Sequence, residues 1–249
     1  MAGHSKWKQI KRAKGVTDAK RGQMFTKLAR EITVAARLGI PDPDVNFRLR
    51  IAIQKARAEN MPNDNIKRAI DRAAGSGEND NFAEIIYEGY GPNGMAVMVK
   101  ALTDNRNRTV GEVRAVFTRS GGSLGESGSV GYLFDQIGLI TLDATGADPD
   151  ELTLLAIDAG AEDIRTDGEE GAMEIITAPS ELKAVQDVLT AQGLKIEDAQ
   201  ISMQPKAPMA LSEEAQIKGL RLIEKLEDLD DVQEVYTNIE ISDDVMAQV

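Results

Sequence analysis

The sequence predicts a multi-domain protein of the α and α+β classes: an N-terminal three-helix domain, then an α+β domain with a ferredoxin-like βαββαβ domain inserted in it. Apolar residues recur with the 3.6-residue period of helices as far as about residue 74, and short alternating strands begin at residue 83. The charge changes sign at the same place. Residues 1–72 carry 17 Lys and Arg against 7 Asp and Glu, whereas residues 73–249 carry 12 against 34.

The composition excludes several kinds of chemistry. The chain has no cysteine and one histidine, His4, so we expect no disulfide, no metal site, no cofactor and no cysteine nucleophile. Serine–histidine catalysis would depend on His4 in a mobile arm, and we therefore expect no enzymatic activity. No apolar run approaches the roughly 20 residues of a membrane helix, and the first residues lack the pattern of a secretory signal. We expect a cytoplasmic protein without a membrane partner.

Residues 1–16 form a basic arm with little apolar content to pack, which we expect to be mobile until it meets a polyanion. Its candidate nucleic-acid-binding residues are His4, Lys6, Trp7, Lys8, Lys11, Arg12 and Lys14. The cations would neutralise phosphates and release counterions, and the indole offers a face for stacking bases. The alternative is a solvated tail, which leaves the tryptophan without a role.

The first helix is expected to begin at Thr17 or Asp18 and to end before Gly39. One face is apolar, with Phe25, Leu28, Ile32 and Ala36, and the opposite face is predicted to be a solvated basic stripe. The candidate nucleic-acid contacts on this helix are Lys20, Arg21, Lys27, Arg30 and Arg37. A basic face that is only solvated is the alternative; the adjoining arm favours binding.

Two further helices complete a basic domain over residues 1–75. The second follows the turn at 42–44 and ends near Glu59, and the third spans residues 63–74. The buried stripe of the second helix is expected to hold Val45, Leu49, Ala52, Ile53 and Ala56. The cations expected to extend the positive surface are Arg48, Arg50, Lys55, Arg57, Lys67, Arg68 and Arg72.

The body begins with a hairpin and a helix. Strands are predicted at 83–90 and 95–102, a turn at 91–94, a helix at 106–119, and extended structure again at 132–134. The glycine-rich run at 121–131 lacks the lysine of a phosphate-binding loop, and a strand follows it rather than a helix. A bulged or flexible β-connection is the favoured interpretation.

Residues 137–204 have the element order of a complete ferredoxin-like unit. The expected strands are 138–142, 163–166, 173–177 and 195–203, and the expected helices are 150–159 and 180–191. A last helix at 212–226 and a strand at 232–239 would complete the earlier, unfinished α+β unit. The predicted domains are therefore 1–75, then 82–134 plus 209–249, with 137–204 inserted.

A second anion contact is possible at Asn105, Arg106 and Arg108, where a strand leads into a helix N-terminus. The alternative is plain capping by Asp104 or Asn105, with the arginines paired to nearby acids. The acid-rich segment 224–231 has neither calcium-loop spacing nor a histidine beside it, so a solvated acidic face is favoured over a metal site. Such acidic domains repel nucleic acid and could bind protein partners.

Several motifs, in order along nearly the whole chain, resemble the YebC family. They are Met1 to Trp7, Asp18 to Gly22, Phe25 to Lys27, Tyr87 to Pro92, Asp104 to Thr109, Gly128 to Phe134, Ala159 to Asp163, Leu226 to Asp228 and Asp231 to Tyr236. Two positions depart from the pattern: Gln23 stands where a basic residue is expected, and Gly131 where alanine is expected.

The resemblance implies one helical and two α+β domains, the last inserted in the middle one, a cytoplasmic location and no catalysis. Bacterial members are classed as probable DNA-binding transcriptional regulators. A mitochondrial member is a translational activator for a cytochrome oxidase subunit, and the family has been tied to ribosomes stalled on proline-rich sequences. The first hypothesis is thus a DNA-binding regulator; the alternative is a translation factor that binds rRNA on the ribosome. We find no helix-turn-helix signature in the sequence.

Overall fold

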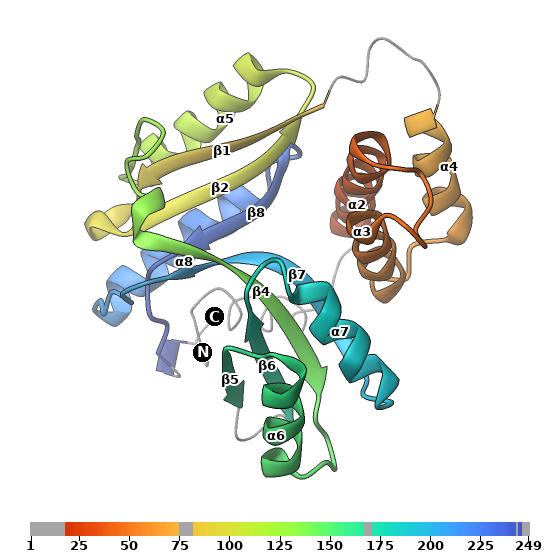
Figure 1. The fold of residues 1–249 in the computed structure, drawn as a ribbon. Coiled ribbons are helices and arrows are strands. Elements are labelled where there is room, and N and C mark those ends of the chain that lie inside the picture. The colour runs from red at the N-terminus through yellow and green to blue at the C-terminus, as the bar shows by residue number, and fades with distance from the viewer. Residues whose placement is uncertain (1–17, 75–81, 167–170, 243, 246–249) are drawn as a thin grey trace.

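The computed structural model describes residues 18–74, 82–166, 171–242 and 244–245. The N-terminal helices are α2 (Asp18–Leu38), α3 (Phe47–Ala58) and α4 (Asn63–Ala74). They enclose a core of their own, to which α2 gives Leu28 and Ile32, α3 gives Leu49, and α4 gives Ile66. Figure 1 shows this group of helices on the right, beside two separate sheets.

The first sheet, sheet A, joins distant parts of the chain. Its strands are β1 (Ala83–Tyr90), β2 (Ala96–Thr103), β3 (Ser123–Leu124) and β8 (Val232–Thr237), in the order β3-β1-β2-β8. Helices α5 (Arg106–Arg119) and α8 (Glu213–Glu227) bury Phe117 and Leu222 in one core with residues of β2 and β8. The other core of this sheet brings Met98 and Tyr236 against Phe134.

The second sheet, sheet B, is formed by the stretch of chain between those two parts. Its strands are β4 (Phe134–Asp143), β5 (Asp163–Thr166), β6 (Ala172–Thr177) and β7 (Ile196–Pro205), in the order β5-β6-β4-β7. Every pairing is antiparallel. Helices α6 (Pro149–Ala159) and α7 (Leu182–Ala191) pack into its core, as a ferredoxin-like unit requires.

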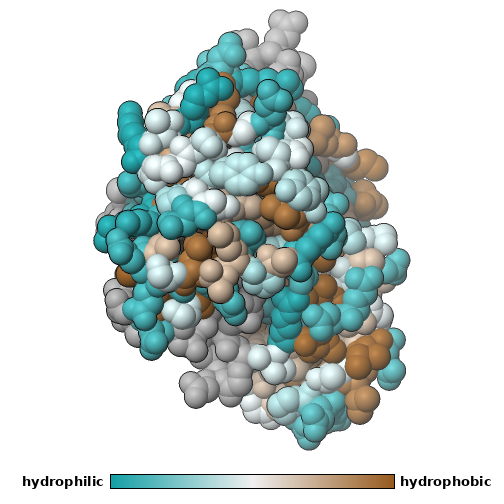
Figure 2. Space-filling model, turned by 90° about the vertical axis from the view of Figure 1, so that its left-hand side faces the viewer, coloured by the Kyte–Doolittle hydropathy of each residue, from teal (hydrophilic) through white to brown (hydrophobic). Residues whose placement is uncertain are grey.

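The predicted fold class is confirmed: three helices precede an α+β body with two antiparallel sheets. The pairing of β8 with β2 brings the C-terminal segment into the sheet of the first α+β unit. The exact domain boundaries stay a prediction. On the side that faces left in Figure 1, hydrophilic residues are interspersed with small apolar groups, as expected of a solvated surface (Figure 2).

Two local predictions were wrong. Val45 is 65% exposed because α3 begins only at Phe47, so Val45 lies in the loop before the helix rather than in its buried stripe. Residues Gly131–Leu133 form a short 3₁₀ turn, and extended structure resumes only at Phe134.

The glycine-rich run is held by a carboxylate. Glu88 of β1 accepts hydrogen bonds from the backbone N–H groups of Gly128, Val130 and Gly131, at 2.6–2.8 Å. Burial would raise the pKa of Glu88, but these three donors lower it below its usual value. The run therefore does bind an anion, and the anion is a side chain of the protein itself. A Cβ at position 131 would lie 3.3 Å from the Glu88 oxygens, which makes glycine the easier fit.

Within the described ranges, no helix combines the length and the apolar character needed to cross a membrane.

Candidate nucleic-acid interface

The predicted residues of the arm lie outside the described part of the chain. These are His4, Lys6, Trp7, Lys8, Lys11, Arg12 and Lys14. The structure can therefore be compared only with the predictions for α2, α3, α4 and the start of α5.

Arg30 of α2 is directed into the body rather than into solvent. Its guanidinium donates to the backbone oxygens of Leu102 and Asp230 and to the carboxylate of Asp231, at 3.1, 2.8 and 2.9 Å. It also lies 5.3 Å from the centre of the Phe82 ring, within the range of a cation–π contact. Only 14% of the side chain is exposed. The predicted solvated stripe is thus corrected at Arg30, which holds α2 against the body.

Asp231 is the acceptor at the centre of this contact. Its side chain is 2% exposed and receives hydrogen bonds from Thr103, Thr109, Arg108 and Arg30. Burial alone would raise its pKa, but the hydroxyl and guanidinium donors lower it below the usual value. A buried carboxylate is stable when it is fully paired, and the donors to Asp231 come from three elements, α2, β2 and α5.

Other side chains of α2 also reach the acidic end of α8 and the segment that follows it. Lys27 donates to the Glu227 backbone oxygen at 2.5 Å, and Lys20 lies 3.8 Å from the Glu224 carboxylate. Gln23, the position that departs from the family pattern, donates to the Asp228 backbone oxygen and to Asp230. Arg21 and Arg37 also have interactions within the molecule. The stripe predicted for nucleic acid is largely occupied by these contacts.

Two of the four cations of α3, Arg48 and Lys55, behave in the same way. Arg48 bridges Glu31 of α2 and Glu84 of β1, at 3.0 and 2.7 Å. Lys55 lies 3.1 Å from Glu234 of β8. Burial would lower the pKa of Lys55, but the Glu234 and Asp198 carboxylates raise it above its usual value. These pairs, predicted as positive surface, instead fasten α3 to sheet A.

At the start of α5, two of the three candidate residues, Asn105 and Arg108, behave as the capping alternative predicts. Asn105 caps the helix by accepting from the Arg108 N–H at 3.1 Å. The Arg108 guanidinium is paired with Asp104 and Asp231, and these acids raise its pKa above the usual value. Arg106 is exposed and has no ion pair with a described residue. A role of this helix start in anion binding stays a prediction.

Helix α4 keeps its cations in solvent. Lys67, Arg68 and Arg72 are exposed, and none of them forms an ion pair with a residue that the structure describes. Arg68 donates only to Asn65 and to the Asp64 backbone oxygen on its own helix. Among the described helices of this domain, α4 presents three such cations, and Arg57 of α3 is also exposed and forms no ion pair with a described residue.

The connection before α4 is one that the sequence analysis missed. Four residues join α3 to α4, and Asn60 among them adopts a left-handed conformation with φ 60°. Helix-turn-helix units use a link of this length, and their second helix is the one that enters the major groove of DNA. The usual signal is glycine in the turn; here asparagine, the next residue type that tolerates this conformation, takes its place.

No group of three or more acidic or histidine side chains in the described part of the chain is arranged to hold a metal ion. The arrangement can bind a polyanion through α4 and hold α2 and α3 on the acidic body.

Two protein-family models match this chain. The model described as "TACO1/YebC protein N-terminal domain" matches residues 5–76, and that described as "TACO1/YebC second and third domain" matches residues 82–239. A "Probable transcriptional regulatory protein" of Herpetosiphon aurantiacus is 55% identical over 246 residues, which is 98% of this chain and 97% of the relative. One of Chloroflexus aurantiacus is 53% identical over 251 residues, 100% of this chain and 99% of the relative.

A solved structure is also similar. The crystal structure of the conserved hypothetical protein Aq1575 from Aquifex aeolicus has a TM-score of 0.83 and 51% sequence identity, covering 90% of this chain and 92% of that one.

Proposed function

Because this chain belongs to the TACO1/YebC family, we propose that it is a nucleic-acid-binding regulator of gene expression that acts without catalysis. The relatives named as transcriptional regulatory proteins support the regulatory role. A chain with no cysteine and one histidine has few of the groups that enzymes use as nucleophiles and general bases, which supports the absence of catalysis.

One observation carries the proposal: all three cations of α4 are exposed, whereas Arg30 of α2 and Arg48 and Lys55 of α3 are paired with the body. A positive face opposite an acidic body orients the protein on a polyanion, since the body is repelled while α4 is attracted. The basic arm at residues 1–16 would add further phosphate contacts.

DNA is the first candidate target. The short left-handed link before α4 supports it, because an exposed second helix of such a unit fits the major groove. RNA is the second candidate, with the ribosome as the expected assembly. Trp7 in the arm favours it, since stacking requires an unpaired base.

The first experiment measures the salt dependence of binding to a labelled duplex and to a labelled hairpin RNA. Replacing Lys67, Arg68 and Arg72 with glutamine should reduce the slope of log K against log [salt] by about 2.7 for duplex DNA, since each phosphate contact contributes about 0.9. The matched control replaces Lys183, Lys195 and Lys218 of the body, which removes the same charge elsewhere. Equal slopes for the two triple variants would show that α4 does not contact the nucleic acid.

The target itself is decided by ultraviolet crosslinking in cells. The tagged protein is crosslinked, and the attached nucleic acid is sequenced. Reads concentrated on promoter DNA would support the transcriptional role. Reads concentrated on a few rRNA helices would instead make the protein a translation factor.

A further inference from the structure

Strand β1 leaves most of its outer edge unpaired. It pairs with β2 over its whole length, from Ala83 to Tyr90, without a break in register. On its other side it pairs with β3 only at Gly89 and Tyr90, so no described strand lies beside residues 83–87. We call this stretch the free edge of β1. The unpaired main-chain groups of such an edge are a template for another strand.

The main-chain groups that face the free edge belong to Glu84 and Ile86. The Glu88 backbone oxygen accepts from the Gly125 N–H at 2.8 Å, so Glu88 directs its main-chain groups away from β2. Alternate residues of an antiparallel strand direct these groups to the same neighbour, so Glu84 and Ile86 also point outward. Neither of them forms a main-chain hydrogen bond on that side with a residue that the structure describes.

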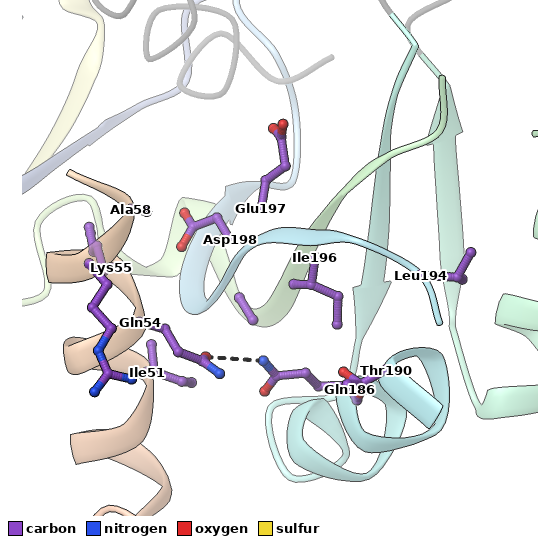
Figure 3. Close-up of a pocket in the computed structure, with 12 residues that line it drawn as sticks. Ile51, Gln54, Lys55, Ala58, Gln186, Thr190, Leu194, Ile196, Glu197 and Asp198 are labelled. Atoms are coloured by element: carbon purple, nitrogen blue, oxygen red, sulfur yellow. Dashed lines mark hydrogen bonds between the residues drawn. The ribbon is translucent and has the colours of Figure 1, made fainter. Parts of the chain in front are cut away.

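The other strand edges are shorter or irregular. Strand β5 spans only four residues, and β8 has a bulge at Gln233, where its register against β2 shifts. Strand β7 has a bulge at Glu197, and helices α3 and α7 pack beside it. Figure 3 shows Gln54 of α3 and Gln186 of α7 joined by a hydrogen bond of 3.3 Å next to that strand. Because bulges bend a strand and interrupt pairing, β1 is the better template.

An apolar hollow lies next to the free edge. Ile86 is 46% exposed and lines a space of about 60 Å³ between the two sheets. Its other apolar lining comes from Met98 of β2 and from Ile201 and Met203 of β7, and Ile201 is itself 38% exposed. The space is far smaller than the roughly 300–1,000 Å³ of a small-molecule site. It therefore suits a single side chain of a larger ligand.

The charges around the hollow are already paired. The Glu84 carboxylate, which is part of the lining, lies 2.7 Å from the Arg48 guanidinium and 3.4 Å from the Lys100 ammonium. A carboxylate that has two cationic partners gains little from a third. The side chain that enters the hollow is therefore expected to be aliphatic rather than charged.

We propose that the free edge of β1 binds an extended, uncharged peptide segment of a partner protein, which adds to sheet A in line with β3. Main-chain hydrogen bonds to Glu84 and Ile86 supply the affinity, as in other cases of strand addition. An aliphatic side chain of the segment enters the hollow beside Ile86. The binding uses neither α4 nor the arm, so it is independent of the proposed nucleic-acid contacts.

A second copy of this chain fits the edge less well than a peptide. The unpaired stretch covers only residues 83–87, and β3 and Gly125 already occupy the edge beyond it. A contact of that length buries much less than the roughly 1,200–2,000 Å² of a stable protein–protein interface. A single extended segment needs no larger area, because main-chain hydrogen bonds hold it.

The test uses the full-length protein and a fluorescein-labelled octapeptide of alternating valine and serine, with binding followed by anisotropy. Two derivatives carry N-methyl groups, one on the valine amides and one on the serine amides. Alternate amides of a strand point to opposite edges, so only one derivative loses the donors that face β1. That derivative should bind about tenfold more weakly than the parent peptide, or worse, and the other should bind like the parent.

On the protein side, Ile86→Pro removes an outward N–H group and leaves the bonds to β2 in place, since an edge strand tolerates proline on its outer side. It should weaken binding about tenfold, whereas the control Ile86→Val keeps the N–H group and should bind like the parent. A second variant, Ile201→Glu, makes the hollow polar and should also weaken binding. Its matched control is Val188→Glu on α7, where the apolar side chain is similarly exposed, at 41%.

Hydrogen exchange locates the bound peptide. The amides of Glu84 and Ile86 should slow when the parent peptide is added, while those of Ile85 and Tyr87, which face β2, should change little. The proposal is overturned if the parent peptide shows no saturable binding, if the two methylated peptides bind equally, or if slowing appears elsewhere. Slowing at Glu84 and Ile86 on raising the protein concentration alone would make a second copy the occupant, which also overturns it.

Discussion

Helices α2 and α4 have the same kind of sequence and opposite surroundings. Both are amphipathic, and both carry several Lys and Arg on the side away from their shared core. Yet Arg30 of α2 is buried against Asp231, whereas Lys67 and Arg72 of α4 remain in solvent. A basic helix face is therefore not by itself a binding site. Whether it stays open depends on where the acids of the same chain fold.

The groups that accept hydrogen bonds from the cations of α2 belong to the C-terminal segment, about 200 residues away in the sequence. The end of α8 and the link to β8 present the Glu227 and Asp230 backbone oxygens and the Asp231 carboxylate together. Backbone oxygens at a helix C-terminus attract cations even without acidic side chains. The basic N-terminal part and the acidic C-terminal part thus form an internal interface.

The largest effect is expected from a truncation that removes the acidic C-terminal part of this interface. A chain ending at residue 208 loses α8 and β8, and with them Leu220, Leu222 and Val235 of the sheet A core. Because β2 then loses its neighbouring strand, we expect the region 83–124 to lose cooperative protection from hydrogen exchange.

Sheet B at residues 134–205 serves as the internal control in this experiment and should stay protected. If 83–124 kept its slow exchange in the shortened chain, the predicted split domain would be wrong.

The second largest effect, a loss of unfolding free energy, is expected from Asp231→Asn. The substitution leaves the buried Arg30 without its carboxylate and Arg108 with Asp104 alone, and breaking a buried pair costs about 3–5 kcal/mol of unfolding free energy. Urea denaturation measures the loss. Asp230→Asn is the matched control, since that exposed side chain accepts one bond from Gln23, and it should stay within about 0.5 kcal/mol of the parent. A loss below 1 kcal/mol for Asp231→Asn would contradict the role assigned to this contact.

Acid should lower the unfolding free energy by protonating Asp231 and Glu88. Asp231 and Glu88 have pKa values below the ordinary 3.8 and 4.5, so the stability they contribute is complete above those ordinary values. It is lost as the pH falls through the lower pKa values of the folded state. The unfolding free energy should be level from pH 7 to 5 and decline below about 4.5. Asp231→Asn should show a shallower decline; an identical pH profile would separate Asp231 from the effect.

The smallest effect is expected at the edge of the α2 contact. Lys20 and Glu224 are 53% and 46% exposed and 3.8 Å apart, so solvent screens their attraction. Lys20→Gln should change the unfolding free energy by less than about 0.5 kcal/mol, and the change should vanish in 0.5 M salt. A larger loss would show that the whole stripe, not only Arg30, holds α2 in place.

Local order in this chain could be predicted because it depends on nearby residues. The apolar period places α4 at residues 63–74 and α5 at 106–119, and both agree with the structure. The order of strands and helices was enough to predict the ferredoxin-like unit. Val45 was misplaced because its spacing fits the buried stripe although the helix begins two residues later, where Asn46 caps it.

By itself, the sequence determined most of the helices and strands, the two α+β units and the separation of charge along the chain. Only the tertiary structure decided which cations meet carboxylates. Arg30 and Arg72 look alike in the sequence because each lies on the polar side of an amphipathic helix. They differ in three dimensions because Asp231 lies beside one and solvent beside the other. Electrostatic attraction depends on distance in space, and residues 200 apart in sequence are brought within hydrogen-bond distance only by the fold.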